Sequence, residues 1–523
     1  MKTPTRKDMV YGGASMSGWT IVLLIAVGMP AFSVLPLQAA TAKEAITDSG
    51  ITAAVEDGFM FEKGVFPNFV DVTTTDGIVT LSGSLNNILA KGRAIKIAES
   101  IRGVRGVIDR LTVIPVSRPD EDVRKDVLAA LLQDSATESY QVAASVKDAV
   151  VTLTGSVGSW PEEQLAVRVA EGVKGVKDVH NEITINYLAK RTDPEITADA
   201  AVALQWDIWL NGEFINVSAN AGKVSLTGTV GSAIAKSRAV DDVWVNGVTE
   251  VADSGLTVEP WARDASRRKH QFVVKTDQEI QQAVQAAFRA DPRVSGFSST
   301  INVRIEDDVV ILTGSVGNLK AKTAAEHDAT DTVSVWWVDN LLKVRLQSWP
   351  PDADSEKALK AALLWDPLLD SLTVEAAVIN HVAYLSGTVD SDLQKADAQD
   401  VATRTKGVAE VRNRLKVEPE ELAVSYYSWP YYSYSYDPYD EFEFIGPQPI
   451  KSDGRIKHDI ERAFFWSPFV HRNDIQLKVG QGVATLTGTV GSWLAYGEAQ
   501  RDAYKGGASF VRNRLKVKKG AWF

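Results

Sequence analysis

A pattern of ten residues recurs six times along this chain, and the recurrence limits the possible folds more than any other feature. Its clearest copy, at residues 150–159, reads Val-Val-Thr-Leu-Thr-Gly-Ser-Val-Gly-Ser. Self-similarity at a nearly fixed period is the signature of repeated structural units, so we expect six modules of roughly seventy residues. The glycines at the centre of the six copies are spaced by 72, 73, 86, 73 and 101 residues and are Gly83, Gly155, Gly228, Gly314, Gly387 and Gly488.

The second copy shows the internal order of a module. Apolar residues recur at helical spacing over 121–133, two alternating runs follow at 141–146 and 150–156, a second helix is expected over 160–172, and an alternating run covers 179–185. The module is therefore α-β-β-α-β. We expect an α+β fold, in which two helices pack on one face of a three-stranded mixed sheet.

Two local signals refine this module. Ser159 followed by Glu162 is a capping box that predicts the start of the second helix. A glycine inside a strand, such as Gly155, indicates a bulge or a close backbone approach, and we expect a helix to pack tightly over it. A phosphate-binding loop is the alternative, but no lysine follows at Walker spacing and no G-x-G-x-x-G precedes the helix.

The repeats divide the chain into expected domains separated by two connectors. Residues 261–275 form a polar, locally basic connector, and residues 420–451 form an aromatic-rich linker that contains Tyr426–Phe444. The six modules are expected at 43–115, 118–188, 193–260, 276–347, 352–419 and 452–519.

Repeat five contains Trp365-Asp366-Pro367, Leu385-Ser386-Gly387-Thr388-Val389, Ala396, Ala402, Gly407-Val408 and Val411-Arg412-Asn413-Arg414-Leu415-Lys416-Val417. In these residues the module resembles the BON domain, which occurs in osmotically inducible and nodulation-type envelope proteins of bacteria. Repeats one and four depart most, the former in Leu81-Ser82-Gly83-Ser84-Leu85 and the latter in Val335-Trp336-Trp337-Val338. The resemblance implies a periplasmic or membrane-associated module that binds surfaces, is commonly proposed to contact phospholipid, and lacks enzymatic activity.

The N-terminal residues have the layout of a secretory signal peptide. Lys2, Arg6 and Lys7 precede an apolar run over 19–35, and Ala40-Thr41-Ala42 reads as a cleavage site. We expect residues 1–42 to be removed, which leaves a periplasmic protein, peripheral on a membrane or free, with no integral span. An uncleaved N-terminal anchor is the alternative.

Composition excludes several classes of function. The net charge of −11 gives no support to a nucleic-acid partner, and the chain has no cysteine for disulfides, thiolate catalysis or sulfur-bound zinc. The six histidines are scattered without paired-ligand spacing, and acidic pairs such as Asp241-Asp242 have the pattern of solvated surface. No catalytic constellation is present, so we expect no enzyme activity, no cofactor and no metal site.

The third strands of repeats five and six carry the candidate lipid contacts. Strand periodicity places three cations of each strand on one face, opposite the apolar residues. Such cations can bind lipid phosphates at about 1 kcal/mol each. The alternative is a solvated face whose charges protect a strand edge. The six candidates are Arg412, Arg414, Lys416, Arg512, Arg514 and Lys516.

Two aromatic features complete the set. Trp206, Trp365 and Trp466 end the first helix of their repeats, where we expect packing into the core of the same repeat rather than a membrane interface. Tyr426–Phe444 is expected to dock on repeat five or six, since exposed aromatics promote aggregation.

These observations predict a non-catalytic, multi-repeat binding scaffold of the bacterial envelope that supports envelope integrity or osmotic tolerance. Repeats of this size bury little surface alone, so neighbours are expected to pack in pairs. The expected partner is an anionic phospholipid surface. The alternative is a protein–protein adaptor of the envelope that has no contact with lipid.

Overall fold

The structure is a computed structural model that describes residues 46–517, apart from 62–68, 135–136, 138–139, 188–189, 209, 211–213, 263–274, 307–308, 336, 347, 368, 370–373, 390–391, 418–450 and 509. The expected signal peptide, most of the basic connector and the tyrosine-rich stretch therefore lie outside the described residues.

Repeat two shows the module in its plainest form. Helix α3 (Asp120–Gln133) is followed by the antiparallel strands β4 (Gln141–Lys147) and β5 (Val150–Val157). Helix α4 (Trp160–Glu171) then leads to β6 (Asp178–Ile185), which pairs parallel with β5. The predicted α-β-β-α-β order and mixed sheet are confirmed.

The other repeats contain the same elements in the same order. The third strand is in two pieces in repeats four and five, and both pieces pair parallel with the second strand. The bounds are α1 (Asp48–Phe61), β1 (Val70–Thr75), β2 (Ile78–Leu85), α2 (Ile88–Glu99) and β3 (Gly106–Val113) in repeat one; α5 (Asp193–Trp206), β7 (Ile215–Asn220), β8 (Lys223–Val230), α6 (Ala233–Asp242) and β9 (Glu250–Val258) in repeat three; α8 (Asp277–Ala290), η3 (Ser295–Thr300), β10 (Ile301–Glu306), β11 (Val309–Val316), α9 (Leu319–Thr330), β12 (Trp337–Asn340) and β13 (Lys343–Val344) in repeat four; α10 (Asp352–Trp365), β14 (Val374–Ile379), β15 (Val382–Val389), α11 (Asp392–Arg404), β16 (Glu410–Asn413) and β17 (Lys416–Val417) in repeat five; and α12 (Asp453–Trp466), η4 (Arg472–Asp474), β18 (Ile475–Gly480), β19 (Val483–Val490), α13 (Trp493–Lys505) and β20 (Phe510–Val517) in repeat six.

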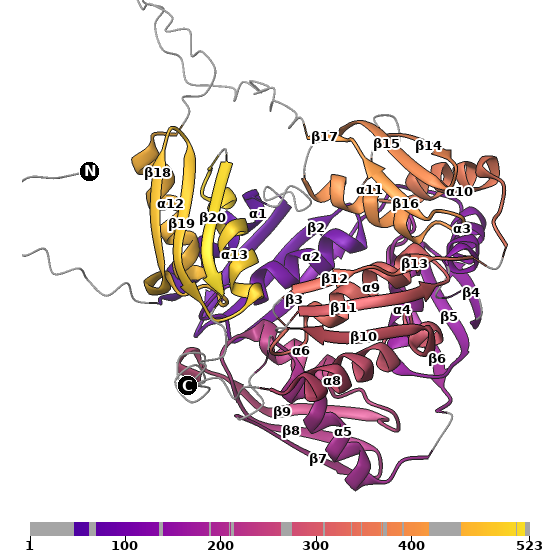
Figure 1. Cartoon of the computed structure of the whole chain (residues 1–523), viewed down its shortest axis with the longest axis horizontal. Helices are drawn as coiled ribbons and strands as arrows, with labels where there is room; N and C mark the ends of the chain where they lie inside the picture. Colours follow the sequence, from indigo (N-terminus) through magenta and orange to yellow (C-terminus); the bar gives the residue numbers. More distant parts are fainter. Residues whose placement is uncertain are drawn as a thin grey trace, which may run out of the picture. The chain divides into compact units, whose positions relative to one another are not determined.

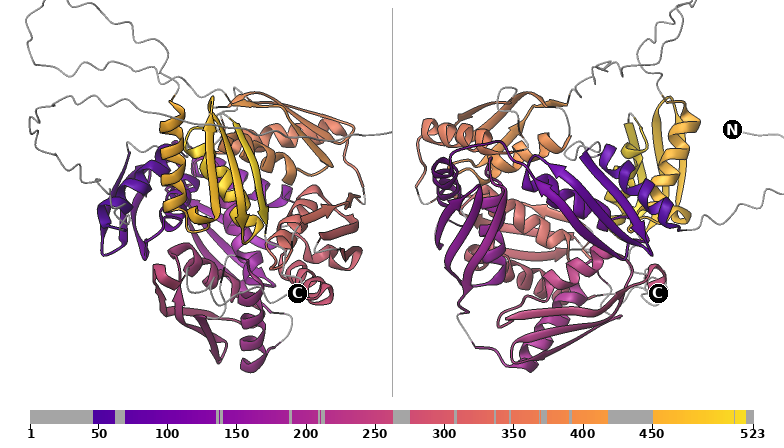
Figure 2. Two further views of the ribbon diagram at one scale, coloured as in Figure 1. Left: turned by 60° about the vertical axis from the view of Figure 1, so that its left-hand side comes forward. Right: turned by 180° about the vertical axis from the view of Figure 1, so that it is seen from behind.

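Each repeat has one core, between its sheet and its two helices. The second strand is central in every sheet, and the helices cover one face of it (Figures 1 and 2). In repeat two, alternate residues Val151 and Leu153 of β5 are fully buried against Val127, Leu165 and Val169 of the helices. The opposite face of each sheet carries the alternate, mostly polar side chains.

An aspartate at the first position of helix one fastens this helix to the hairpin turn. The carboxylate of Asp120 accepts hydrogen bonds from the backbone N–H groups of Asp148 and Ala149, both at 2.9 Å. These turn residues have φ values of 54° and 64°, as a type I′ turn requires. The same pair of bonds is made by Asp48, Asp193, Asp352 and Asp453.

Candidate interaction surfaces

On the described strands β18, β19 and β20, the open sheet face of repeat six carries basic side chains and no carboxylate. On β20, Arg512, Arg514 and Lys516 are exposed and lie beside the threonines of β19. On β18, Lys478 is exposed on the same face, across Thr485 from Arg512. Among the described residues, none of these four cations forms an ion pair with a carboxylate. The open face of repeat six also includes Gln476, Gly480, Val483, Thr485, Thr487, Thr489 and Phe510.

The corresponding face of repeat five is less basic, although its third strand has the same sequence. Arg412, Arg414 and Lys416 are exposed as their alternation predicted. However, the Arg412 guanidinium donates to the Glu410 carboxylate at 2.9 Å and lies 5.6 Å from the ring centre of Tyr384. The hydrogen bond to Glu410 raises the pKa of Arg412, which holds this cation in a local pair. Glu375 on β14 adds a second carboxylate to the face.

Acidic side chains also lie on this face of the first four repeats. The strand register places at least one carboxylate there in each of them, so the basic face of repeat six differs from the other five. The acidic residues are Asp71 in repeat one, Asp178 and Glu182 in repeat two, Glu250 in repeat three, and Glu306 and Asp339 in repeat four.

The repeated strand glycines lie against a neighbouring strand and not under a helix. A Cβ atom added at Gly155, whose φ is +134°, would lie 2.0 Å from the carbonyl oxygen of Gln141 at the start of β4. The expectation that a helix packs over this glycine is therefore wrong. The close approach is to backbone, and the glycine has a positive φ that L-residues rarely adopt. Gly83, Gly228, Gly314, Gly387 and Gly488 also have positive φ.

The BON domain matches the chain at residues 47–115, 119–187, 192–260, 276–345, 351–419 and 452–519. The chain belongs to the BON domain family. Osmotically-inducible protein Y of Escherichia coli (strain K12) is 31% identical over 143 residues, which cover 26% of this chain and 71% of that protein.

Two solved structures of CdsD, described as a structural protein of the type III secretion system of Chlamydia trachomatis, also align with this BON protein. They are 15% and 16% identical, cover 42% and 41% of this chain and 99% and 100% of their own, and each superposes with a TM-score of 0.12. A superposition at that score supports no conclusion about this chain.

The tryptophans that end helix one contact other BON repeats. Trp466 packs against the core of repeat one and Trp206 against the core of repeat four, so the expected packing within their own repeats is wrong. Each offers its backbone carbonyl to a second repeat: Arg102 N–H donates to Trp466 at 2.9 Å, and Val333 N–H donates to Trp206 at 3.0 Å. A tryptophan side chain suits packing in the core of its own repeat and in the core of another repeat equally well. The sequence alone therefore does not distinguish the two.

A third contact of this kind joins repeats two and five. Lys174 N–H donates to the Trp365 carbonyl at 2.6 Å. A helix-one tryptophan thus joins repeat six to repeat one, repeat five to repeat two, and repeat three to repeat four. Only the last pair consists of neighbours along the chain, and contact is made by helix ends rather than by sheet edges.

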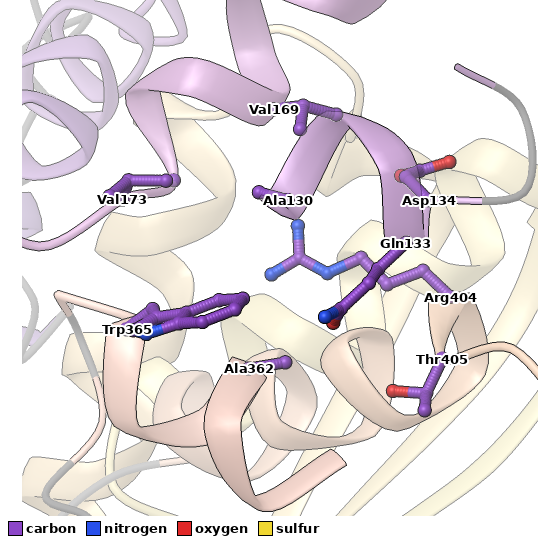
Figure 3. A pocket seen from close by; sticks show the side chains of 10 residues that line it. Ala130, Gln133, Asp134, Val169, Val173, Ala362, Trp365, Arg404 and Thr405 are labelled. Carbon is purple, nitrogen blue, oxygen red and sulfur yellow. The ribbon is translucent and has the colours of Figure 1, made fainter. Parts of the chain in front are cut away.

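Repeats two and five line a small, partly open cavity at this contact (Figure 3). Its volume is about 40 Å³, the space of a few water molecules and too little for an ordinary small-molecule ligand. The Arg404 guanidinium and the Trp365 indole project into it, with Gln133 beside them. The lining residues are Ala130, Gln133, Asp134, Val169, Gly172, Val173, Ala362, Trp365, Arg404 and Thr405.

Buried carboxyl pairs follow helix one in repeats three, four and five. Asp207, Asp291 and Asp366 each share a hydrogen bond with an aspartate of helix two and pair with an arginine of the same repeat. Burial, and then the charge of the helix-one aspartate, raises the pKa of the helix-two partner, to about 9 for Asp397. The expectation that Asp242 is solvated surface is wrong, because one of its carboxylate oxygens is fully covered. The three pairs are Asp207–Asp242, Asp291–Asp328 and Asp366–Asp397.

Ion pairs across repeat boundaries accompany these carboxyl groups. Arg238 of repeat three reaches Asp331 of repeat four at 3.0 Å. Lys320 of repeat four pairs with Asp134 of repeat two at 2.5 Å, and both side chains are nearly inaccessible, at 11% and 2% exposure. A charge buried this deeply is tolerated only with its partner in place, so these pairs help to determine how the repeats fit together.

Neither a metal-ligand cluster nor a membrane-spanning helix is present among the described residues. No group of three or more His, Cys, Asp or Glu side chains in that part of the chain is arranged to hold a metal ion. Among the same residues, no helix has the length and apolar character needed to cross a bilayer.

Proposed function

We propose that this six-repeat BON protein is an exported, non-catalytic scaffold of the bacterial envelope that attaches to anionic phospholipid surfaces and supports envelope integrity or tolerance of osmotic stress. The observation that carries the proposal is the open sheet face of repeat six. Four exposed cations there, Lys478, Arg512, Arg514 and Lys516, lie on one side of one sheet with no carboxylate among them.

The strength of this contact follows from the charges. Each cation near an anionic surface contributes about 1 kcal/mol, so four give about 4 kcal/mol, a dissociation constant of about 1 mM. Phe510, which is 54% exposed at the end of the same strand, adds an apolar group beside them. One such face binds weakly, and stable attachment needs several faces, or several molecules, bound to one surface.

The stripe of Arg412, Arg414 and Lys416 in repeat five is the second candidate contact. Its charge is offset by Glu410 and Glu375 on the same face. We therefore assign the larger share of surface binding to repeat six. Both stripes need solvent access and neither depends on the helix contacts between repeats.

The name of the E. coli relative supports a role in osmotic stress. An envelope role also agrees with the expected signal peptide, which directs the chain to the periplasm. The alternative is an adaptor that binds other envelope proteins without touching lipid. The same open faces would serve it, so the two functions differ in the partner and not in the surface.

Vesicle co-sedimentation separates the two. The mature chain should sediment with vesicles that contain phosphatidylglycerol, should not sediment with pure phosphatidylcholine vesicles, and should dissociate at high salt. Replacing Arg512, Arg514 and Lys516 by glutamate should abolish most of the binding. The matched control is the same change at Arg412, Arg414 and Lys416, which should reduce binding less.

Two outcomes contradict the proposal. Binding that is unchanged by the repeat-six substitutions would show that this face is not the contact. A mature chain that ignores anionic vesicles altogether would favour the protein adaptor.

A further inference from the structure

Three pairs of repeats are joined through a helix-one tryptophan. Trp466 of repeat six meets repeat one, Trp365 meets repeat two, and Trp206 meets repeat four. Their partners end the same helix in Phe61, Gln133 and Ala290. Among the described residues, none of these three pairs brings together two repeats that both end this helix in tryptophan.

The contact between repeats two and five is nearly two-fold symmetric. Eight of the ten residues that line its cavity come from equivalent positions of the two repeats: Ala130 matches Ala362, Gln133 matches Trp365, Gly172 matches Arg404, and Val173 matches Thr405. Interfaces of this kind place the same position of both partners near one another around the axis. A large side chain at one such position therefore limits the size of the side chain at its counterpart.

In two of these matched pairs of positions, a large side chain lies opposite a smaller residue. Trp365 is opposite Gln133, and the Arg404 side chain is opposite Gly172, where an added Cβ would lie 3.8 Å from the guanidinium. In Figure 3 the indole and the guanidinium together fill the centre of the contact. The remaining space of about 40 Å³ is too small for a second indole, and interiors at this density do not yield readily.

We propose that the residue ending helix one determines which BON repeats pair: a repeat that ends this helix in tryptophan accepts only a repeat that ends it in another side chain. At the contact of repeats two and five, the repeat that fits the tryptophan repeat is one with room at this position, which Gln133 provides. This rule selects among the repeats of one chain, and it applies equally to repeats of a second copy.

The test exchanges the two residues in the full mature chain. Three variants are compared: Trp365→Gln, Gln133→Trp, and the double exchange. The measurement is hydrogen exchange by mass spectrometry of the peptide that contains Lys174, whose amide donates to the Trp365 carbonyl. Each single change should speed exchange by about tenfold or more, because one leaves a void and the other introduces a clash. The double exchange should recover at least half of the lost protection, on a logarithmic scale.

Two controls make the result specific. Trp206→Gln should speed exchange at Val333, the donor in the pair of repeats three and four, and leave Lys174 unchanged. Gln133→Leu should be tolerated, since it removes the amide without adding an indole. The proposal is overturned if the double exchange is as unprotected as the sum of the two single changes, or if Gln133→Trp keeps the protection of the unmodified chain.

Discussion

Replacing Asp397 with asparagine should stabilise repeat five at neutral pH. In the folded chain Asp397 is hydrogen-bonded to Asp366, and burial, followed by the charge of Asp366, raises its pKa to about 9. Arg404 and Asp400 also act on this carboxyl, the first lowering and the second raising its pKa. In the unfolded chain the same group has its ordinary pKa of 3.8, so folding takes up a proton throughout the interval between the two values.

The size of the effect follows from linkage. One pKa unit corresponds to about 1.4 kcal/mol, and pH 7 lies about three units above the unfolded value, so the uptake costs about 4 kcal/mol. Because the folded pKa of Asp397 is raised, its contribution to stability is most favourable below about pH 4. This contribution falls by about 1.4 kcal/mol per pH unit up to about pH 9. Asparagine resembles the protonated acid and needs no proton. Asp397→Asn should therefore raise the free energy of unfolding at pH 7 by up to about 4 kcal/mol. It should also remove the contribution of one proton from the slope of stability against pH.

The assay is denaturant-dependent hydrogen exchange of peptides from β15 at pH 5, 6, 7 and 8, which reports on repeat five alone. The control is Glu375→Gln, which removes an exposed carboxylate from the open face of the same repeat and should leave the slope unchanged. A variant that is less stable than the parent at pH 7, or one whose pH dependence runs parallel to it, would refute the reasoning.

Three further predictions concern single contacts, each checked by thermal and denaturant unfolding. Gly155→Ala should cost on the order of 3 kcal/mol or more, because the new Cβ would overlap the Gln141 carbonyl at a positive φ. Asp120→Ala should cost about 1–2 kcal/mol through two lost turn hydrogen bonds, whereas Asp120→Asn should retain part of them. Lys320→Met should cost about 3 kcal/mol by leaving Asp134 buried without this partner, and the same change with Asp134→Leu should recover most of it.

The order of elements within a repeat was predictable because its signals are local. Val123, Val127 and Leu131 follow the helical period and are all buried on one face of α3. Ser159 caps α4 as expected and accepts from the Glu162 N–H, although the Glu162 carboxylate accepts from Gly158 rather than from the cap residue. Signals of this kind act over three or four residues and can be read directly from the sequence.

Contacts between distant segments were not predictable in this way. The hairpin turn is tied to helix one by an aspartate 28 residues earlier, and nothing near Asp120 in sequence indicates that partner. The same limit applies to Asp242, whose burial depends on Asp207 and Arg238 rather than on its acidic neighbour. A pair of adjacent acids is usually solvated, and only the packing of two helix ends makes this case different.

For the basic third strands of repeats five and six, the exposure of the cations was predictable and the difference between the two repeats was not. Period-two alternation correctly placed Arg412, Arg414, Arg512 and Arg514 on the exposed side of their strands. The difference between the two repeats arises from neighbours, because register brings Glu375 to the face of repeat five and Lys478 to that of repeat six. Identical strand sequences therefore present different electrostatic surfaces.

The two kinds of surface lie on opposite sides of the module, and this separation bears on how the chain can work. Helix ends are used in contacts between repeats, where Trp206, Trp365 and Trp466 each meet a second repeat. The open sheet faces are left for external partners, since their side chains alternate away from the helices. Changes at the helix ends and on the open faces should then act independently. Six sheets built from one pattern can share a common internal architecture while each outward face diverges, and the charge of repeat six is the clearest divergence in this chain.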